Sequence, residues 1–229
     1  MSKIKHIIIF SHGFGVKKDA RGLFSDIAGI FIDSENVMFD YNVIDEEKNL
    51  ITVKPFSEQA AILKNKINGI VEKNPGAVID IICHSQGAII AGLAKPEVVR
   101  KIILIAPPSS SDVDRMINTF KSRPGTVINF KGISRLARND GSMTIILPEY
   151  WTERKEIKPL ELYKNLSGMG ELIIINANQD EVLDKTALSG LEKVKIINID
   201  GNHNFSGEDR KKLLEIIEEF IDDKNLCQK

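Results

Sequence analysis

The pentapeptide Cys83-His84-Ser85-Gln86-Gly87 is the most informative stretch of this 229-residue chain. It directly follows the apolar run Val78–Ile82 and opens a segment of small residues, 88–94. A strand that turns sharply into a helix around a central serine predicts a nucleophile elbow, which lifts the serine hydroxyl clear of the sheet. Small residues must flank the serine, because strand and helix nearly touch there. Gly87 meets this requirement, and Cys83, which stands where glycine is more usual, is small enough to fit.

Short apolar runs recur along the chain, with helical patterns between them. The runs are 7–10, 37–41, 78–82, 102–105, 172–175 and 194–199. Most are continuously apolar, which is typical of parallel strands covered on both faces. Ser57 is expected to cap a helix whose apolar residues follow at helical spacing, and Ser206 with Asp209 predicts the start of the last helix. The fold class is therefore predicted as α/β, a mainly parallel sheet of about six strands flanked by helices.

The interval 107–170 departs from this alternation. It shows no clear apolar strand and is interrupted by Pro107-Pro108, Pro124-Gly125 and Asp140-Gly141. A long interval of this kind inside a compact domain is usually functional. We expect one α/β domain over 1–229, with 107–170 inserted as a cap. The alternative is an ordinary long crossover with one or two packing helices.

Composition excludes several classes of protein. The hydrophobic content of 42% supplies a sizeable core, and the net charge of −1 argues against a nucleic-acid partner. No apolar run approaches the roughly 20 residues that span a membrane. Two cysteines, Cys83 and Cys227, form no disulfide framework, which favours a reducing, cytoplasmic location. The histidines are too scattered for the spacing of metal ligands.

The residues for acyl transfer follow the predicted strands in a consistent order. Ser85 is the candidate nucleophile, Asp180 follows the penultimate strand, and His203 follows the last one. All three fall beyond the carboxyl ends of parallel strands, where open α/β sheets bind their ligands. The order Ser, Asp, His is that of one known type of triad. Other candidates for the acid are Asp184 and Asp200, which are nearby in the sequence, and Asp112 or Asp114, which follow the fourth strand.

An oxyanion hole is predicted from the loop after the first strand. His12-Gly13-Phe14-Gly15 has glycines on both sides of Phe14, which lets the loop turn tightly. The backbone N–H groups of Phe14 and Gln86 are the two expected donors. His84 and His12 are expected to be structural, and Cys83 to be a buried small residue.

These pieces carry a resemblance that covers nearly the whole chain. Residues 12–15 and 83–87, together with Asp180 and His203, resemble the α/β-hydrolase superfamily, in particular small bacterial hydrolases of the esterase and serine-aminopeptidase type. The resemblance implies a mainly parallel sheet flanked by helices, an acyl-enzyme mechanism and no cofactor.

The resulting hypothesis is a serine hydrolase that cleaves an ester, thioester or amide of a small acyl compound through an acyl-enzyme on Ser85. An acyltransferase or lyase on the same scaffold is one alternative, since a fold does not determine a reaction. A non-catalytic binding module is another. The sequence identifies neither the substrate nor the oligomeric state.

A run of positive charge adds one hypothesis about the substrate. Between 115 and 138 the chain has six cationic side chains and no acidic ones; they are Arg115, Lys121, Arg123, Lys131, Arg135 and Arg138. Such a run over the mouth of a site would attract an anionic substrate. The competing interpretation is a solvated helix face paired with Asp112, Asp114 and Asp140.

Overall fold

A six-stranded parallel sheet forms the centre of the molecule, in the order β10-β9-β6-β5-β1-β2. The computed structural model describes residues 4–183, 188, 190–191 and 194–221. The strands are β1 (His6–Ser11), β2 (Glu35–Val37), β5 (Val78–His84), β6 (Lys101–Ile105), β9 (Glu171–Ala177) and β10 (Lys195–Ile199). The prediction of a parallel α/β sheet is confirmed. The second strand is displaced, however, since β2 ends where the run 37–41 begins.

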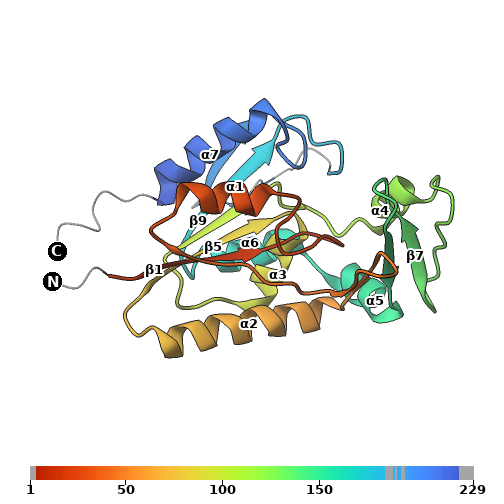
Figure 1. Ribbon diagram of the computed structural model, residues 1–229, viewed down its shortest axis with the longest axis horizontal. Helices are drawn as coiled ribbons and strands as arrows, with labels where there is room; N and C mark the ends of the chain where they lie inside the picture. The colour runs from red at the N-terminus through yellow and green to blue at the C-terminus, as the bar shows by residue number, and fades with distance from the viewer. Residues whose placement is uncertain (1–3, 184–187, 189, 192–193, 222–229) are drawn as a thin grey trace.

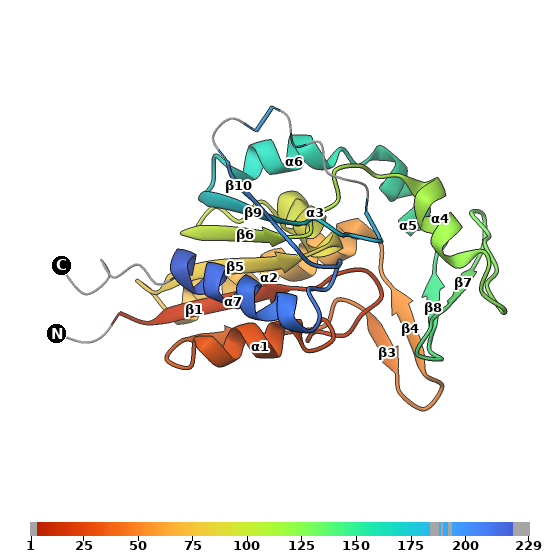
Figure 2. The same cartoon turned by 90° about the horizontal axis from the view of Figure 1, so that it is seen from above.

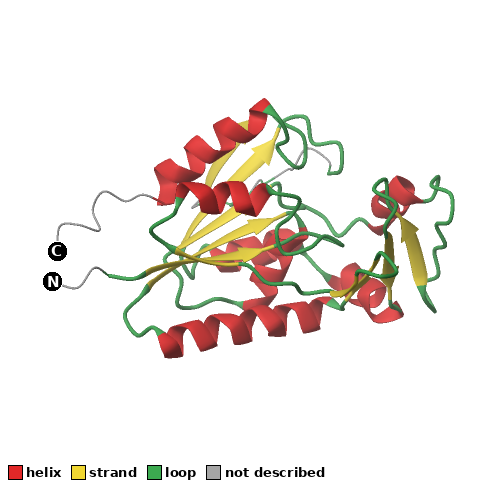
Figure 3. Ribbon diagram, viewed as in Figure 1, coloured by secondary structure: helices red, strands yellow, loops and turns green. Residues whose placement is uncertain are grey.

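Helices cover both faces of this sheet (Figures 1 and 3). One face carries α1 (Leu23–Ile30) and α7 (Glu208–Ile221), and the other carries α2 (Phe56–Lys73), α3 (Gln86–Ala94) and α6 (Pro159–Leu166). Successive side chains of a strand point to opposite faces. In β1, Ile7 and Ile9 accordingly pack under α2 and α3, while Ile8 and Phe10 pack under α1 and α7. This burial on both faces explains the continuous apolar runs.

A second, four-stranded sheet lies beyond one end of the main sheet (Figure 2). Its order is β3-β4-β8-β7, formed by β3 (Val43–Asp45), β4 (Leu50–Val53), β7 (Ser134–Ala137) and β8 (Met143–Ile146). The interval 107–170 also contains α4 (Val113–Phe120), α5 (Pro148–Glu156) and α6. It therefore holds two short strands that its apolar pattern does not reveal, and β8 pairs with β4 from an earlier part of the chain.

The sequence predicts that Ser57 caps α2. This prediction is wrong, because the helix begins one residue earlier, at Phe56. Instead its amide donates to Glu153 Oε2 at 2.8 Å and its hydroxyl donates to Glu153 Oε1 at 2.6 Å. These bonds join α2 to α5. The helix that carries Tyr150 and Arg154 is thus held against the main domain.

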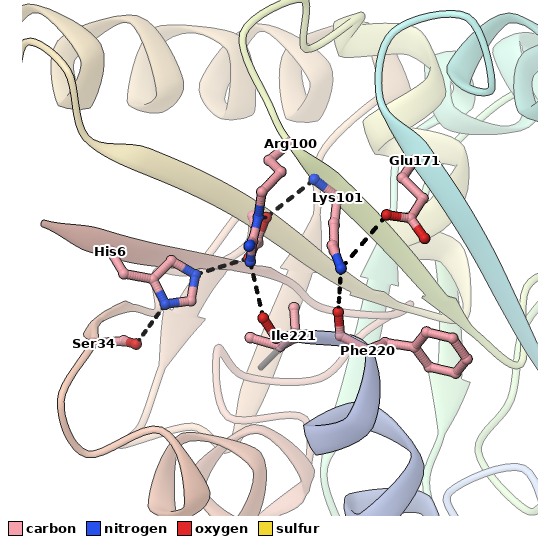
Figure 4. Close-up of polar contacts among 8 residues, drawn as sticks. His6, Ser34, Arg100, Lys101, Glu171, Phe220 and Ile221 are labelled. Carbon is pink, nitrogen blue, oxygen red and sulfur yellow. Dashed lines mark hydrogen bonds and ion pairs between the residues drawn. The ribbon is translucent and has the colours of Figure 1, made fainter. Parts of the chain in front are cut away.

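A buried polar cluster lies at the amino ends of the strands (Figure 4). Asp80 accepts hydrogen bonds from Arg100 Nε at 3.0 Å and contacts His6 Nε2 at 2.8 Å. Arg100 and Lys101 donate in turn to the last carbonyl groups of α7, those of Ile221 and Phe220. The cluster attaches the end of α7 to β1, β5 and β6. None of the helices in the described part of the chain is both long enough and apolar enough to cross a membrane.

Candidate active site

Ser85 occupies a strained turn between β5 and α3. Its backbone has φ 53° and ψ −124°, so a non-glycine residue adopts positive φ at this position. Strain of this kind is characteristic of functional sites whose surroundings enforce it. The amide of Ser85 donates to the carbonyl of Ile105 at 2.9 Å, which holds the turn against β6.

Gly87 is required by the close approach of α3 to β1. A Cβ atom at this position would collide with the carbonyl oxygen of Ser11. Ser11 also donates from its hydroxyl to the Gly87 carbonyl at 3.0 Å. The expected need for a small residue after the serine is therefore explained by backbone contact. Cys83 is fully buried, and burial raises the pKa of its thiol, which fits a packing role.

Two consecutive hydrogen bonds connect the side chains of Ser85, His203 and Asp180. His203 Nε2 lies 3.0 Å from Ser85 Oγ, and His203 Nδ1 lies 2.7 Å from Asp180 Oδ2. The other oxygen of Asp180 accepts from the amides of Val182 and Leu183 at 2.8 and 2.7 Å. Burial by itself would raise the pKa of Asp180, but the His203 hydrogen bond and these amides hold it below its ordinary value. The carboxylate therefore stays ionised beside the imidazole.

The alternative acids make other contacts or lie outside the described residues. Asp200 accepts from the side chains of Asn178 and Gln179. Asp112 caps α4 by accepting from the amide of Arg115, and Asp114 lies exposed in the first turn of that helix. Asp184, like Cys227, lies outside the described residues.

His84 and Glu181 hold the His203 loop in place, and of the two only Glu181 was given no role from the sequence. His84 Nε2 donates to the backbone carbonyl of His203 at 3.0 Å, and Glu181 Oε2 accepts from the His203 amide at 3.0 Å. Burial lowers the pKa of His84 to about 3, so its ring is neutral. The structural role expected for His84 is thus specifically to support His203. Adjacency to Ser85 and Asp180 was the only signal available in the sequence.

The loop 12–15 is braced from both ends. His12 Nδ1 donates to the carbonyl of Gly13 at 2.9 Å, and its Nε2 accepts from the amide of Tyr41 at 3.1 Å. From beyond β7, Arg138 Nη2 donates to the carbonyls of Phe14 and Gly15 at 3.0 and 2.7 Å. Within the described part of the chain, the amides of Phe14 and Gln86 have no hydrogen-bond acceptor.

A pocket of about 720 Å³ opens over Ser85 and His203. Phe14 and Gln86 line it, so the predicted oxyanion donors and the nucleophile face one cavity. The far wall comes from α4, α5 and the residues that follow β7. Phe14 and Phe120 form its aromatic part, with ring centroids 6.3 Å apart. Tyr150 is fully buried behind them and packs against Phe14, with ring centroids 5.7 Å apart.

The positive run divides into two groups. Arg115, Arg123 and Arg138 line the pocket, whereas Lys121, Lys131 and Arg135 are exposed elsewhere. Two further lining arginines, Arg21 and Arg154, lie outside the run that the sequence singles out. Helical and loop geometry, which the spacing of charges does not reveal, decides which cations reach the site.

The fold is similar to that of several solved structures. Est1E from Butyrivibrio proteoclasticus has 16% sequence identity and a TM-score of 0.64, with 96% of this chain and 88% of that chain covered. A metagenome-derived lipolytic enzyme of the LipS and LipT pair has 14% identity, a TM-score of 0.66 and coverage of 96% and 94%. The peroxisomal alpha-beta-hydrolase Lpx1 from Saccharomyces cerevisiae has 14% identity, a TM-score of 0.65 and coverage of 95% and 77%.

No model of a known protein family and no curated protein sequence matches the chain. At these identities the structural similarities establish the fold. They confirm the fold class that the sequence predicts, because the helix-flanked parallel sheet is shared over almost the whole chain.

Proposed function

This chain has the α/β-hydrolase fold, and on that premise we propose that it is a serine hydrolase acting on an ester, thioester or amide of a small acyl compound. The observation that carries the proposal is the hydrogen-bonded series Ser85–His203–Asp180, with distances of 3.0 and 2.7 Å. The structural similarity to the lipolytic enzymes LipS and LipT supports hydrolysis as the reaction class.

In the proposed mechanism, Ser85 Oγ attacks the carbonyl carbon of the substrate and His203 Nε2 takes the hydroxyl proton. Asp180 orients the imidazole through Nδ1 and stabilises the imidazolium that forms. The amides of Phe14 and Gln86 donate to the tetrahedral oxyanion, each contributing roughly 3–4 kcal/mol to transition-state stabilisation. His203 then protonates the leaving group, and a water molecule activated by the same imidazole hydrolyses the acyl-enzyme.

The proposed cap over residues 107–170 supplies the far wall of the pocket. Met116 and Phe120 from α4 and Arg154 from α5 line it opposite the strand ends. A wall of this kind encloses a small acyl group and excludes part of the water around it.

A labelling experiment tests the proposal. A fluorophosphonate probe should modify the wild-type protein at Ser85, and a panel of acyl esters of varied length should be hydrolysed. Ser85→Ala should lose both labelling and turnover while its circular dichroism spectrum and melting temperature stay close to wild type. Unchanged hydrolysis by Ser85→Ala would overturn the proposal, and transfer of the acyl group to an added alcohol in preference to water would favour an acyltransferase.

A further inference from the structure

Arg154 is a buried cation without an acidic partner among the described residues. Its side chain projects from α5 into the pocket wall, and the residue is only 9% exposed. Nη1 lies 3.3 Å from the hydroxyl of Tyr150, and Nε has no acceptor in the described part of the chain. An arginine stays charged in proteins, and a buried charge without a partner is costly. Arg154 therefore needs an anionic partner that the described residues do not provide.

The acidic side chains of the pocket wall do not supply this anion. Asp112 accepts from the amide of Arg115, Asp140 accepts from Ser142, and Glu181 accepts from the amide of His203. Five arginines line the same wall against these three acids. The described lining residues therefore carry a net positive charge.

The neighbouring arginines add to the positive electrostatic potential of the pocket. The guanidinium of Arg123 lies 4.6 Å from the centroid of the Phe120 ring, and that of Arg138 lies 5.6 Å from it. Burial, together with the charges of Arg21 and Arg123, lowers the pKa of Arg138 to about 10. Arg138 already donates to the carbonyls of Phe14 and Gly15 and to Thr144. Arg154, by contrast, keeps donors for a ligand.

Two hydrogen bonds connect Arg154 with the residue that follows the nucleophile. Arg154 Nη1 contacts the Tyr150 hydroxyl, which donates to Gln86 Oε1 at 2.7 Å. The Tyr150 ring also packs against Phe14, whose centroid lies 5.7 Å away. Tyr150 therefore links the unpaired cation to Gln86 and Phe14, the two residues of the predicted oxyanion hole.

We propose that Arg154 binds a carboxylate of the substrate, so that the preferred substrates are monoesters of short dicarboxylic acids that keep one free carboxylate. The inference rests on the proposed function, because it assumes that Ser85 attacks the ester at the other end of the same molecule. A planar guanidinium matches a carboxylate with two parallel hydrogen bonds. The single positive charge of Arg154 is balanced by one free carboxylate, which a monoester of a dicarboxylic acid provides.

The first test measures binding and needs no turnover. In the Ser85→Ala background, calorimetry compares monomethyl glutarate with dimethyl glutarate, which differ in the free carboxylate. The monoester should bind on the order of 30-fold more tightly, the scale expected for a desolvated charge pair. Adding Arg154→Met should remove this preference, Arg154→Lys should keep part of it, and Arg135→Ala, an exposed cation outside the pocket, should leave it unchanged.

The second test measures kcat/KM of the wild-type protein for the glutarate mono-4-nitrophenyl ester and its methyl-capped neutral analogue. The anionic ester should be preferred, and Arg154→Met should lower the ratio of the two values roughly 30-fold. Should Arg154→Met prove unfolded by circular dichroism, Arg154→Gln, which retains a hydrogen-bond donor, takes its place. Inorganic phosphate inhibiting more strongly than glutarate would overturn the choice of a carboxylate.

The outcomes separate the two proposals. Equal binding and equal hydrolysis of both esters, unaffected by Arg154→Met, would overturn the carboxylate subsite and leave the hydrolase standing. Carboxylate-dependent binding without hydrolysis of either ester, and without labelling of Ser85, would overturn the hydrolase and retain the subsite.

Discussion

At the scale of single residues, Asp180 is held through both of its carboxylate oxygens. One carboxylate oxygen meets His203 Nδ1, and the other is occupied by the amides of Val182 and Leu183. This double engagement keeps the carboxylate ionised and fixes its direction, so the imidazole presents Nε2 to Ser85. The same residue therefore decides both the tautomer and the orientation of His203.

Asp180→Asn is expected to lower kcat by about 10⁴-fold, because an amide no longer selects the productive tautomer of His203. Steady-state hydrolysis of a neutral 4-nitrophenyl ester measures the effect. Asp200→Asn is the matched control, since Asp200 instead accepts from Asn178 and Gln179. A comparable loss in Asp200→Asn, with Asp180→Asn active, would show that Asp180 is not the acid.

At the scale of elements, Arg138 joins the second sheet to the loop after β1. Its Nε donates to Thr144 in β8 at 2.8 Å, and its Nη2 donates to the carbonyls of Phe14 and Gly15. These bonds fix the backbone on the carboxyl side of Phe14, next to the peptide group that carries the Phe14 N–H. A side chain from beyond β7 thus positions a loop that is predicted to stabilise the oxyanion.

Arg138→Ala is expected to lower kcat for a neutral ester by up to about 10²-fold, the scale for losing one oxyanion donor, with a smaller change in KM. Arg138→Lys, which retains a donor, should recover part of the loss. Arg135→Ala, three residues earlier and exposed, controls for removal of a cation from this region. A change confined to KM would instead indicate that Arg138 acts on substrate binding.

At the scale of the whole molecule, the strands carry the proposed active site at their carboxyl ends and a structural anchor at their amino ends. The fully buried Asp80 binds Arg100, His6 and the amide of Lys101, while Arg100 and Lys101 hold the end of α7 (Figure 4). Burial alone would raise the pKa of Asp80, but the hydrogen bonds from His6 and Arg100 hold it below its ordinary value. Ionised Asp80 therefore stabilises the fold.

Asp80→Asn is expected to lower the free energy of unfolding by about 3 kcal/mol near neutral pH, because it removes the buried carboxylate from its ion pair with Arg100. Since the folded-state pKa lies below the unfolded value of about 3.9, the stabilisation is complete above that value and is lost as the pH falls through the folded-state pKa. Urea unfolding between pH 7 and 3 should show the wild-type and variant curves converging at the acidic end. Asp114→Asn, exposed on α4, should lie close to wild type throughout.

The sequence alone determined the main sheet and the residues at its carboxyl ends. Five of the six apolar runs coincide with observed parallel strands, because strands buried on both faces need uninterrupted apolar residues. The elbow at Ser85 was also predictable, since Gly87 is required where the backbone of α3 contacts Ser11 and leaves no room for a side chain. Once the strand order is given, Asp180 and His203 fall at one edge of the sheet.

Only the tertiary structure decided the contacts made between distant segments. The short strands β3, β4, β7 and β8 carry weak local patterns, and they form a sheet because segments about 90 residues apart pair with each other. Ser57 looked like a helix cap because local spacing cannot reveal Glu153, which lies 96 residues away. Arg154 likewise has no distinguishing sequence context. Its isolation in the pocket wall arises from the folding of α5 against the main domain, since unpaired charge is a property of a three-dimensional neighbourhood.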